Sequence, residues 1–200
     1  MNDYPLFPMF LKLAGRRCVV VGAGALAESK IASLLDAGAD VVVIAPEATP
    51  GVQELAGAGK LRWLNRPFAA GDLNEAFLVV AATGSPESDE AVFREGRQSG
   101  VLCNAVDDPP RCDFYYGAVV RRGPLQIAIS TGGASPALAA RLRRELEEQF
   151  GPEYQNWLLH LAERRREILA AHLSPEQKRQ ELEGMASRAS FEQFIESSGQ

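Results

Sequence analysis

The sequence has few of the residues that build disulfide frameworks or metal sites. Its 200 residues contain three cysteines and two histidines. Cys18, Cys103 and Cys112 are odd in number, widely spaced and outside any C-x-x-C pair, so no disulfide framework is indicated. His160 and His172 belong to no metal-binding signature, and we expect both to be structural. We therefore predict no resident metal site, and we expect Cys18 and Cys103 to be buried, inert thiols.

The sequence also lacks a long apolar run and an excess of basic residues. No apolar stretch is long enough to cross a bilayer, and the first residues have no basic region followed by an apolar one. We therefore expect a cytoplasmic protein without a membrane partner. The net charge of −5 argues against nucleic acid as a general partner. The apolar fraction of 46% is enough for a real core.

The clearest motif is a glycine turn between an apolar strand and a helix. Residues 18–21 are apolar and mostly β-branched, and they are followed by Gly22, Gly24 and Ala27 in a G-x-G-x-x-A pattern. Gly22 would permit the tight turn, Gly24 the approach of a pyrophosphate, and Ala27 the close packing of helix on strand. A helix over 26–36 and a second strand over 40–44 complete a βαβ unit of the size that binds dinucleotides. The alternative is a glycine turn in an α/β domain that binds no cofactor.

The residues after the second strand bear on the choice of cofactor. An acid at this place accepts hydrogen bonds from the adenine ribose, and Glu47 lies within a few residues of the expected offset. Asp40 is at the wrong end of the strand. No arginine stands beside Glu47, so the sequence favours NAD over NADP. A solvent-exposed loop glutamate is a serious competing interpretation.

Strands and helices continue to alternate as far as Asn104, which predicts a mostly parallel Rossmann-type sheet. The segment Asn104-Ala-Val-Asp-Asp-Pro-Pro110 follows the carboxyl end of the fifth predicted strand, over 101–103, where open α/β sheets place their ligands. Asp107 or Asp108 could act there as a general base. By spacing alone, however, the bland interpretation of an Asp-Asp-Pro turn is favoured.

The pattern then changes to a hairpin and helices. Residues 114–121 and 125–130 read as two strands joined by a turn, and helices follow from Pro136 to the end. We expect an NAD-binding domain over 1–113, a dimerisation region over 114–150 and a C-terminal helical domain over 151–200.

Four stretches together resemble the precorrin-2 dehydrogenase family, the NAD-dependent module of siroheme synthesis. They are Tyr-Pro-Leu-Phe near the start, Val-Gly-Ala-Gly-Ala-Leu-Ala-Glu-Ser-Lys30, Asn-Ala-Val-Asp107 and Gln-Ile-Ala-Ile-Ser-Thr-Gly-Gly-Ala-Ser-Pro136. The resemblance covers about the first three-quarters of the chain. The family often has three consecutive glycines where this chain has Ala23 in the middle, which fits if that residue is not in a left-handed conformation.

The resemblance implies a homodimer that oxidises precorrin-2, a macrocycle with eight carboxylates, to sirohydrochlorin. Some members also insert Fe²⁺ into the product. It makes Asp107 the general base, against the interpretation from spacing alone. The implied cofactor contacts are Gly22, Gly24, Ala25, Leu26, Pro46, Glu47, Thr83 and Asn104. The implied substrate contacts are Ser130, Thr131 and Gly132, with Lys30 and Arg121 as candidate partners for the substrate carboxylates. Two alternatives stay open: a chelatase alone, and a non-catalytic NAD-binding redox sensor.

Overall fold

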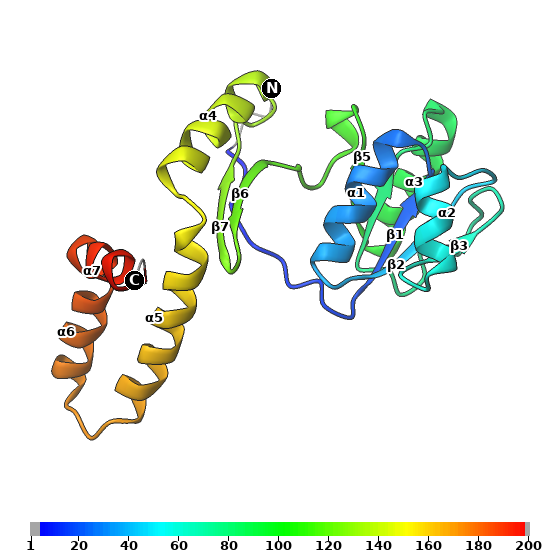
Figure 1. Cartoon of the computed structure of the whole chain (residues 1–200). Helices are drawn as coiled ribbons and strands as arrows, with labels where there is room; N and C mark the ends of the chain where they lie inside the picture. Colours follow the sequence, from blue (N-terminus) through cyan, green and yellow to red (C-terminus); the bar gives the residue numbers. More distant parts are fainter. Residues whose placement is uncertain (1–4, 199–200) are drawn as a thin grey trace. The chain divides into compact units, whose positions relative to one another are not determined.

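The computed structural model describes residues 5–198, which divide into two compact units, residues 5–116 and 117–198 (Figure 1). The first unit holds a five-stranded parallel sheet of order β3-β2-β1-β4-β5. Its elements are β1 (Arg17–Val21), α1 (Ala25–Asp36), β2 (Asp40–Ile44), α2 (Pro50–Gly57), β3 (Arg62–Leu64), β4 (Leu78–Ala81), α3 (Pro86–Ser99), β5 (Leu102–Ala105) and the 3₁₀ turn η1 (Pro109–Arg111). The predicted Rossmann-type sheet is confirmed.

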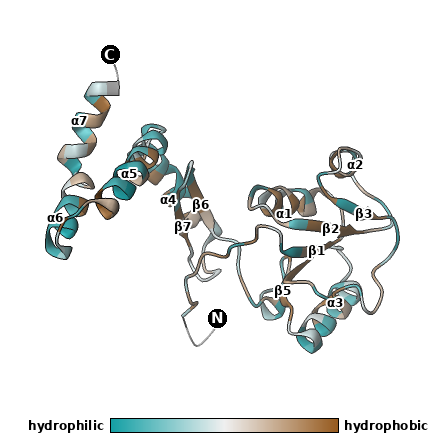
Figure 2. Ribbon diagram, turned by 90° about the horizontal axis from the view of Figure 1, so that it is seen from below, coloured by the Kyte–Doolittle hydropathy of each residue, from teal (hydrophilic) through white to brown (hydrophobic). Residues whose placement is uncertain are grey.

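Helices lie on both faces of the sheet (Figure 2), and the core of this unit forms two layers, one on each face. Successive residues of a strand point to opposite faces, so the valine runs supply both layers at once. Val20 and Val43 pack with Ile31 of α1 on one face, whereas Val19 and Val42 pack with Val92 of α3 on the other. A strand that is buried on both faces must be apolar throughout, which explains why these strands show no alternation.

Local signals set the ends of the helices. Thr49 caps α2 by accepting a hydrogen bond from the N–H of Val52, and Ser85 caps α3 in the same way. α3 ends at Gly100, whose φ of 68° is the left-handed conformation that glycine adopts most readily. The helix predicted over 26–36 is observed as α1, Ala25–Asp36.

The second unit contains a two-stranded antiparallel hairpin and four helices. Its elements are β6 (Ala118–Arg122), β7 (Leu125–Ile129), α4 (Pro136–Gln149), α5 (Glu153–Ala170), α6 (Pro175–Met185) and α7 (Arg188–Ser198). Ser135 caps α4, with Pro136 in the first turn, as the sequence indicates. Within residues 5–198, no helix has the length and apolar character needed to span a membrane.

Two predicted boundaries near the join of the units are wrong. β5 extends to Ala105, beyond the predicted end at Cys103, and the first hairpin strand begins at Ala118 instead of Phe114. β5 extends because Asn104 and Ala105 pair with Val80 and Ala81 of β4. β6 begins at Ala118 because that residue pairs with Ile129, the last residue of β7. Asn104 forms an isolated bridge with Cys112, and the N–H of Asp113 donates to the carbonyl of Cys103 at 2.7 Å. Residues 112–113 therefore pair with β5 and do not belong to the hairpin.

Candidate functional site

The glycine turn lies where β1 ends, between the carboxyl ends of β2 and β4. Gly22 has a φ of 102°, and a Cβ at this position would lie 2.1 Å from the carbonyl oxygen of Ala82. Its N–H donates to the carbonyl of Ile44 at 2.9 Å. Gly22 thus joins three neighbouring strands in a space that no side chain could share.

Gly24 is different, because nothing in the chain requires it to be glycine. It precedes the first residue of α1 with a φ of −83°, and a Cβ there would meet no atom within 4 Å. Ala23 is not among the residues with positive φ, so the alanine in the middle of the motif fits without strain. The first N–H groups of a helix lack intrahelical partners, and α1 has no side-chain cap. The open space at Gly24 therefore fits the approach of a phosphate to this helix end.

A cleft of about 660 Å³ opens in front of this turn. Of the predicted cofactor residues, five line it: Gly22, Gly24, Pro46, Glu47 and Thr83. The remaining walls come from other strand ends and loops, namely Val21, Ala23, Ile44, Ala45, Ala48, Thr49, Pro67, Phe68, Ala82, Ser85 and Ser88. The volume is in the range of cofactor pockets. The cleft spans the point where the strand order reverses, which is where open α/β sheets bind dinucleotides.

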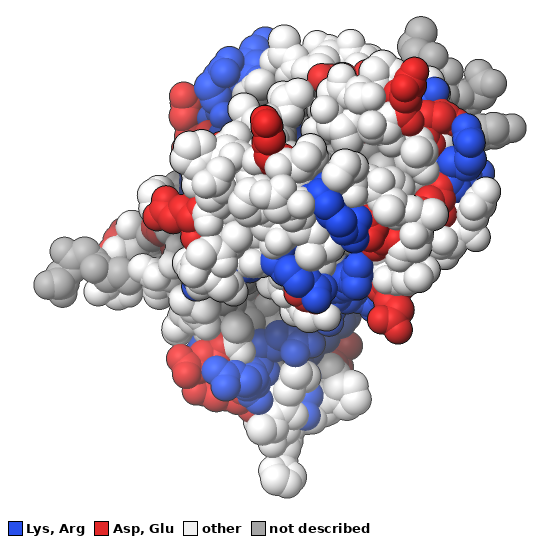
Figure 3. All heavy atoms as spheres, turned by 90° about the vertical axis from the view of Figure 1, so that its right-hand side faces the viewer, with Lys and Arg blue, Asp and Glu red and all other residues white. Residues whose placement is uncertain are grey.

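The charge of the cleft is supplied by backbone and not by cations. Among residues 5–198, no Lys or Arg lines the cleft, and the one charged side chain in its lining is the exposed Glu47. Figure 3 shows acidic and basic side chains interspersed on one face of the molecule. An anionic pyrophosphate would therefore depend on the N-terminus of α1, and a 2′-phosphate would find no arginine. This arrangement fits NAD better than NADP.

Two hydrogen-bonded links hold the loops around the cleft, and the sequence interpretation missed both. Thr49 donates its hydroxyl to the carboxylate of Glu28 in the first turn of α1, and its N–H donates to the carbonyl of Ala23 at 3.1 Å. On the other side, Asp89 of α3 accepts hydrogen bonds from the N–H and hydroxyl of Thr83, at 3.2 and 2.7 Å. The sequence did contain a signal for both links, because Glu28 and Asp89 are acidic residues in the first turns of α1 and α3. These links fix the loops after β2 and β4.

Asp107 lies two residues beyond β5, at the same edge of the sheet as the cleft. The N–H of Val106 donates to the carbonyl of Ala81 at 2.9 Å, which places Asp107 beside the end of β4. The Asp107 side chain is exposed and forms no hydrogen bond or ion pair with residues 5–198. Its φ of 62° is unusual for a residue other than glycine, and such conformations cluster at functional sites.

Three other predicted cofactor residues do not line the cleft. Ala25 and Leu26 are exposed in the first turn of α1, where their backbone N–H groups belong to the free helix end. Asn104 is 7% exposed, and its amide donates to the carbonyl of Phe114 at 2.8 Å and to Sγ of Cys112 at 3.4 Å. The side chain of Asn104 therefore organises the loop that carries Asp107. Direct contact of these residues with the cofactor stays a prediction.

Comparison with known proteins places the sheet unit in a family. Residues 9–118 match the family model described as putative NAD(P)-binding. The chain belongs to this family. Residues 122–149 match a second model, described as the central part of a sirohaem biosynthesis protein. The match to the first model covers the glycine turn, the cleft and Asp107.

The similar proteins carry names from siroheme synthesis. A siroheme synthase of Serratia proteamaculans is 41% identical over 145 residues, which are 72% of this chain and 30% of that protein. A siroheme synthase of Methylococcus capsulatus is 37% identical over 194 residues, 95% of this chain and 40% of that protein. The chain thus spans less than half the length of these relatives.

A solved structure has the same fold over almost the whole chain. SirC, a precorrin-2 dehydrogenase, superposes with a TM-score of 0.80 at 28% sequence identity. The superposition covers 96% of this chain and all of that one. The resemblance stated from the sequence motifs is therefore confirmed.

The predicted substrate residues of this NAD(P)-binding family member are divided between the two units. Lys30 belongs to the sheet unit, where its ammonium lies 4.2 Å from the ring centroid of Tyr116. Arg121 lies in β6, is exposed and forms no ion pair with residues 5–198.

The loop before α4 holds the other three predicted substrate residues. The hydroxyl of Ser130 accepts from the N–H of Gly132 at 3.2 Å, and that of Thr131 accepts from the N–H of Ser135 at 3.2 Å. Each unit thus orders its own candidates by local contacts.

Proposed function

We propose that this chain oxidises precorrin-2 to sirohydrochlorin, with NAD⁺ as the hydride acceptor. One observation carries the proposal: a dinucleotide-sized cleft and an unpartnered carboxylate, Asp107, share one edge of the sheet. The chain that carries them also superposes over 96% of its length on a protein named precorrin-2 dehydrogenase. Hydride removal leaves a proton on the substrate, and a carboxylate at this place can accept it.

The strand order supports separate roles for Glu47 in cofactor binding and Asp107 in proton transfer. Glu47 follows β2 and Asp107 follows β5, on opposite sides of the glycine turn at the end of β1. A dinucleotide with its pyrophosphate on α1 would have its adenosine near Glu47 and its nicotinamide toward β4 and Asp107. When bound, NAD⁺ supplies the hydride acceptor. The residues of this chain orient it, exclude a 2′-phosphate and receive the proton at the Asp107 carboxylate.

The substrate carboxylates require cationic partners, and we propose Lys30 and Arg121 for this role. The exposed guanidinium of Arg121 has no ion-pair partner within residues 5–198, and guanidinium groups bind carboxylates in a bidentate way. The ammonium of Lys30 lies over the ring of Tyr116 and forms no ion pair with a carboxylate of residues 5–198. Ser130, Thr131 and Gly132 are proposed as further substrate contacts, on the resemblance alone.

We also propose that the protein is a homodimer and that dimerisation completes its second unit. Residues 117–198 hold just three of the buried apolar side chains: Val120, Ala139 and Ile168. A two-stranded hairpin is marginally stable by itself in water. A second copy of the chain would supply the missing apolar contacts, and residues 114–150 remain the proposed dimerisation region.

The decisive experiment compares Asp107→Asn with Asp36→Asn in anaerobic assays with precorrin-2 and NAD⁺. Both variants remove one exposed carboxylate, but Asp36 lies at the far end of α1. Loss of a general base should lower kcat about 10²- to 10⁴-fold. The Kd for NAD⁺, measured by calorimetry, should stay unchanged in both variants. Full turnover by Asp107→Asn would refute the role of Asp107, and NAD⁺ binding without any wild-type turnover would favour the redox-sensor interpretation.

Ferrochelation is a second activity that the same assay can test, with Fe²⁺ as a substrate. Residues 5–198 contain no cluster of three or more His, Cys, Asp or Glu that could hold a metal ion. Metal insertion would therefore depend on the macrocycle as ligand and on a protein carboxylate as proton acceptor. Loss of sirohydrochlorin above the protein-free rate after addition of Fe²⁺ would establish this activity.

A further inference from the structure

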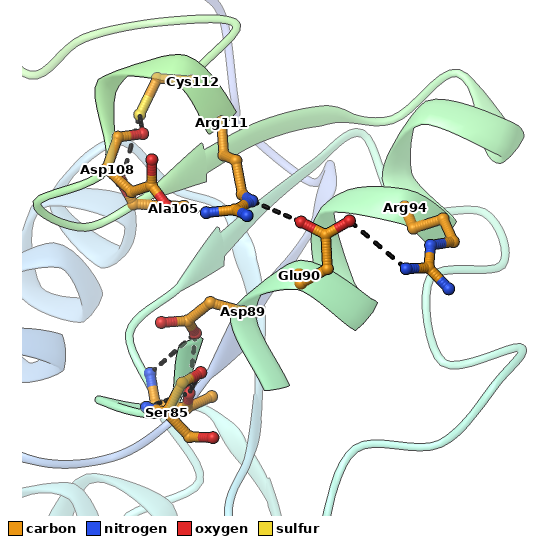
Figure 4. Close-up of polar contacts among 9 residues, drawn as sticks. Ser85, Asp89, Glu90, Arg94, Ala105, Asp108, Arg111 and Cys112 are labelled. Atoms are coloured by element: carbon orange, nitrogen blue, oxygen red, sulfur yellow. Dashed lines mark hydrogen bonds and ion pairs between the residues drawn. The ribbon is translucent and has the colours of Figure 1, made fainter. Parts of the chain in front are cut away.

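The loop that carries Asp107 is tied to α3 through one arginine. Arg111, the last residue of η1, donates from Nη1 to the carboxylate of Asp108 and from Nε to Oε2 of Glu90 at 2.5 Å (Figure 4). Glu90 belongs to α3 and also accepts from Arg94 at 3.4 Å. The side chains of Arg111, Asp108 and Glu90 are about one-third exposed, at 34%, 30% and 36%. Arg111 is thus a bridge between the loop after β5 and the body of the sheet unit.

The backbone around Asp107 forms a tight turn that this bridge holds at one end. The N–H of Asp108 donates to the carbonyl of Ala105 at 3.2 Å, which closes a four-residue turn with Asp107 in third position. A positive φ at that position usually requires glycine or asparagine. Cys112 also holds the turn, because its Sγ lies 3.1 Å from the carbonyl of Ala105 and 3.3 Å from that of Asp108. Ala105 and Asp108, on either side of Val106 and Asp107, are therefore held by hydrogen bonds, whereas the Asp107 side chain forms none with residues 5–198.

Holding a residue in a sparsely populated conformation requires compensating contacts elsewhere. The sulfur contacts are weak, and the N–H of Arg111 adds one further bond, to the carbonyl of Asp108 at 2.9 Å. The charge-assisted bonds of the Arg111 side chain are stronger, and they are the ones that connect the turn to a rigid helix. Ordinary surface ion pairs contribute little to global stability. A local positioning role fits this combination better than a role in overall folding.

We propose that Arg111 is a positioning residue: by binding Asp108 and Glu90 together, it holds the backbone of Asp107 in its left-handed conformation and aims that carboxylate at the reacting carbon. The inference rests on the proposed function of Asp107 as general base. Arg111 touches neither the cleft nor the reacting atoms in this scheme. Its effect on turnover must therefore pass through Asp107.

The test compares Arg111→Met with Arg94→Met, a matched control that removes another cation from Glu90 without touching the loop. Misplacement of a catalytic group by about 1 Å can cost up to about 100-fold. We expect kcat to fall about 10- to 100-fold in Arg111→Met, with the Kd for NAD⁺ unchanged, and to stay at the wild-type value in Arg94→Met. Arg111→Lys, which keeps the charge but cannot bridge both carboxylates in the same way, should recover part of the loss.

A double-mutant cycle separates positioning from direct contact with substrate. In the Asp107→Asn background, Arg111→Met should cause no further loss of residual turnover, because its target is already gone. A full additional loss would overturn the proposal and assign Arg111 to substrate binding. Wild-type kcat in Arg111→Met would also overturn it.

Hydrogen exchange gives a readout that does not depend on the reaction. The N–H groups of Asp108 and Arg111 should exchange faster in Arg111→Met than in the wild type or in Arg94→Met. Unchanged exchange would overturn the positioning role even if activity fell. Should the wild type fail to oxidise precorrin-2, the proposed function would fall by that result alone, and exchange would still test whether Arg111 holds the turn.

Discussion

The two units of this chain are stabilised in different ways. Residues 5–116 contain both clusters of buried apolar residues found within 5–198, one on each face of the parallel sheet. Residues 117–198 bury three apolar side chains and leave others exposed, among them Leu159 at 53% and Leu169 at 43%. The sheet unit has the core of an independent domain, whereas residues 117–198 bury few apolar side chains among themselves. The contrast places the cofactor cleft in the unit with the larger core, and most of the proposed dimerisation region in the unit that buries few apolar side chains.

The largest expected effect comes from Gly22→Ala, which should destabilise the sheet unit. A Cβ would lie 2.1 Å from the Ala82 carbonyl oxygen, at a φ of 102°. Strain and overpacking together should lower the free energy of unfolding by about 3–5 kcal/mol. Thermal and urea unfolding measure this loss.

Gly24→Ala is the matched control for that substitution. Its Cβ would meet no atom of the chain, so stability should change by about 1 kcal/mol or less. The Kd for NAD⁺ should nevertheless rise at least about tenfold, because the methyl group would occupy the path of the pyrophosphate. Equal destabilisation by both substitutions would contradict the distinction between a structural and a ligand-dependent glycine.

The second prediction compares isoleucines in the two units. Ile31 is fully buried in the sheet core, and Ile31→Ala should cost about 2–5 kcal/mol. Ile168 is 6% exposed but belongs to neither core cluster, so Ile168→Ala should cost about 2 kcal/mol or less.

The two tryptophans allow each unit to be followed by itself, since Trp63 lies in β3 and Trp157 in α5. Fluorescence of Trp157→Phe variants reports on the sheet unit, and that of Trp63→Phe variants on the other. A larger loss at Ile168, at concentrations that favour monomers, would mean that the second unit has a core of its own.

The third prediction concerns neighbouring arginines of β6. Arg122 donates to the carbonyls of Phe150 and Glu147 at 2.8 and 2.9 Å, and so caps the end of α4. Arg122→Ala should destabilise the second unit by about 1–3 kcal/mol without affecting the sheet unit. Arg121→Ala should change stability by about 0.5 kcal/mol at most. It should instead raise KM for the polycarboxylate substrate, and an unchanged KM would remove Arg121 from the substrate site.

The smallest effect is on reactivity and not on stability. Burial raises the pKa of the Cys18 thiol to about 11 and that of Cys103 to about 12, and burial also raises the pKa of Cys112, which is partly exposed. At pH 8 about one Cys18 in a thousand, and fewer Cys103, would be thiolate. Cys112 should therefore react first with a disulfide reagent. Because all three cysteines lie in the sheet unit, the slow labelling of Cys18 and Cys103 reports on local or global unfolding of that unit alone. Rapid labelling of all three cysteines would contradict a well-packed core.

Much of the sheet unit could be predicted because its signals are local. The valine runs of β1 and β2, the glycine turn between β1 and α1, and the left-handed Gly100 each act within a few residues. The same is true of Ser135 at the start of α4. The predicted burial of Cys18 and Cys103 is confirmed, both being fully buried.

The loop from Asn104 to Phe114 could not be predicted, because its shape depends on contacts made across the fold. Glu90, which accepts from Arg111, lies on α3 and gives no signal in the sequence near Asp107. The N–H of Asp113 donates to the carbonyl of Cys103, and the Asp113 carboxylate accepts from the N–H of Cys103, so the loop returns along β5. The amide of Asn104 donates to the carbonyl of Phe114 and to Sγ of Cys112, contacts that no local sequence pattern indicates.

The Rossmann-type sheet, the position of the cofactor turn and the family could all be predicted from the amino-acid sequence, because periodicity and short motifs are properties of neighbouring residues. The motif also assigned Gly22 to the turn and Gly24 to the ligand, and the tertiary structure supplied the steric reason: a Cβ at Gly22 would lie 2.1 Å from the Ala82 carbonyl oxygen, whereas one at Gly24 would meet no atom within 4 Å. Tertiary structure alone decided that Asp107 is an unpartnered, left-handed residue in a turn held by Arg111. The physical reason is that steric exclusion and ion pairing act between atoms that are close in space, whatever their separation along the chain.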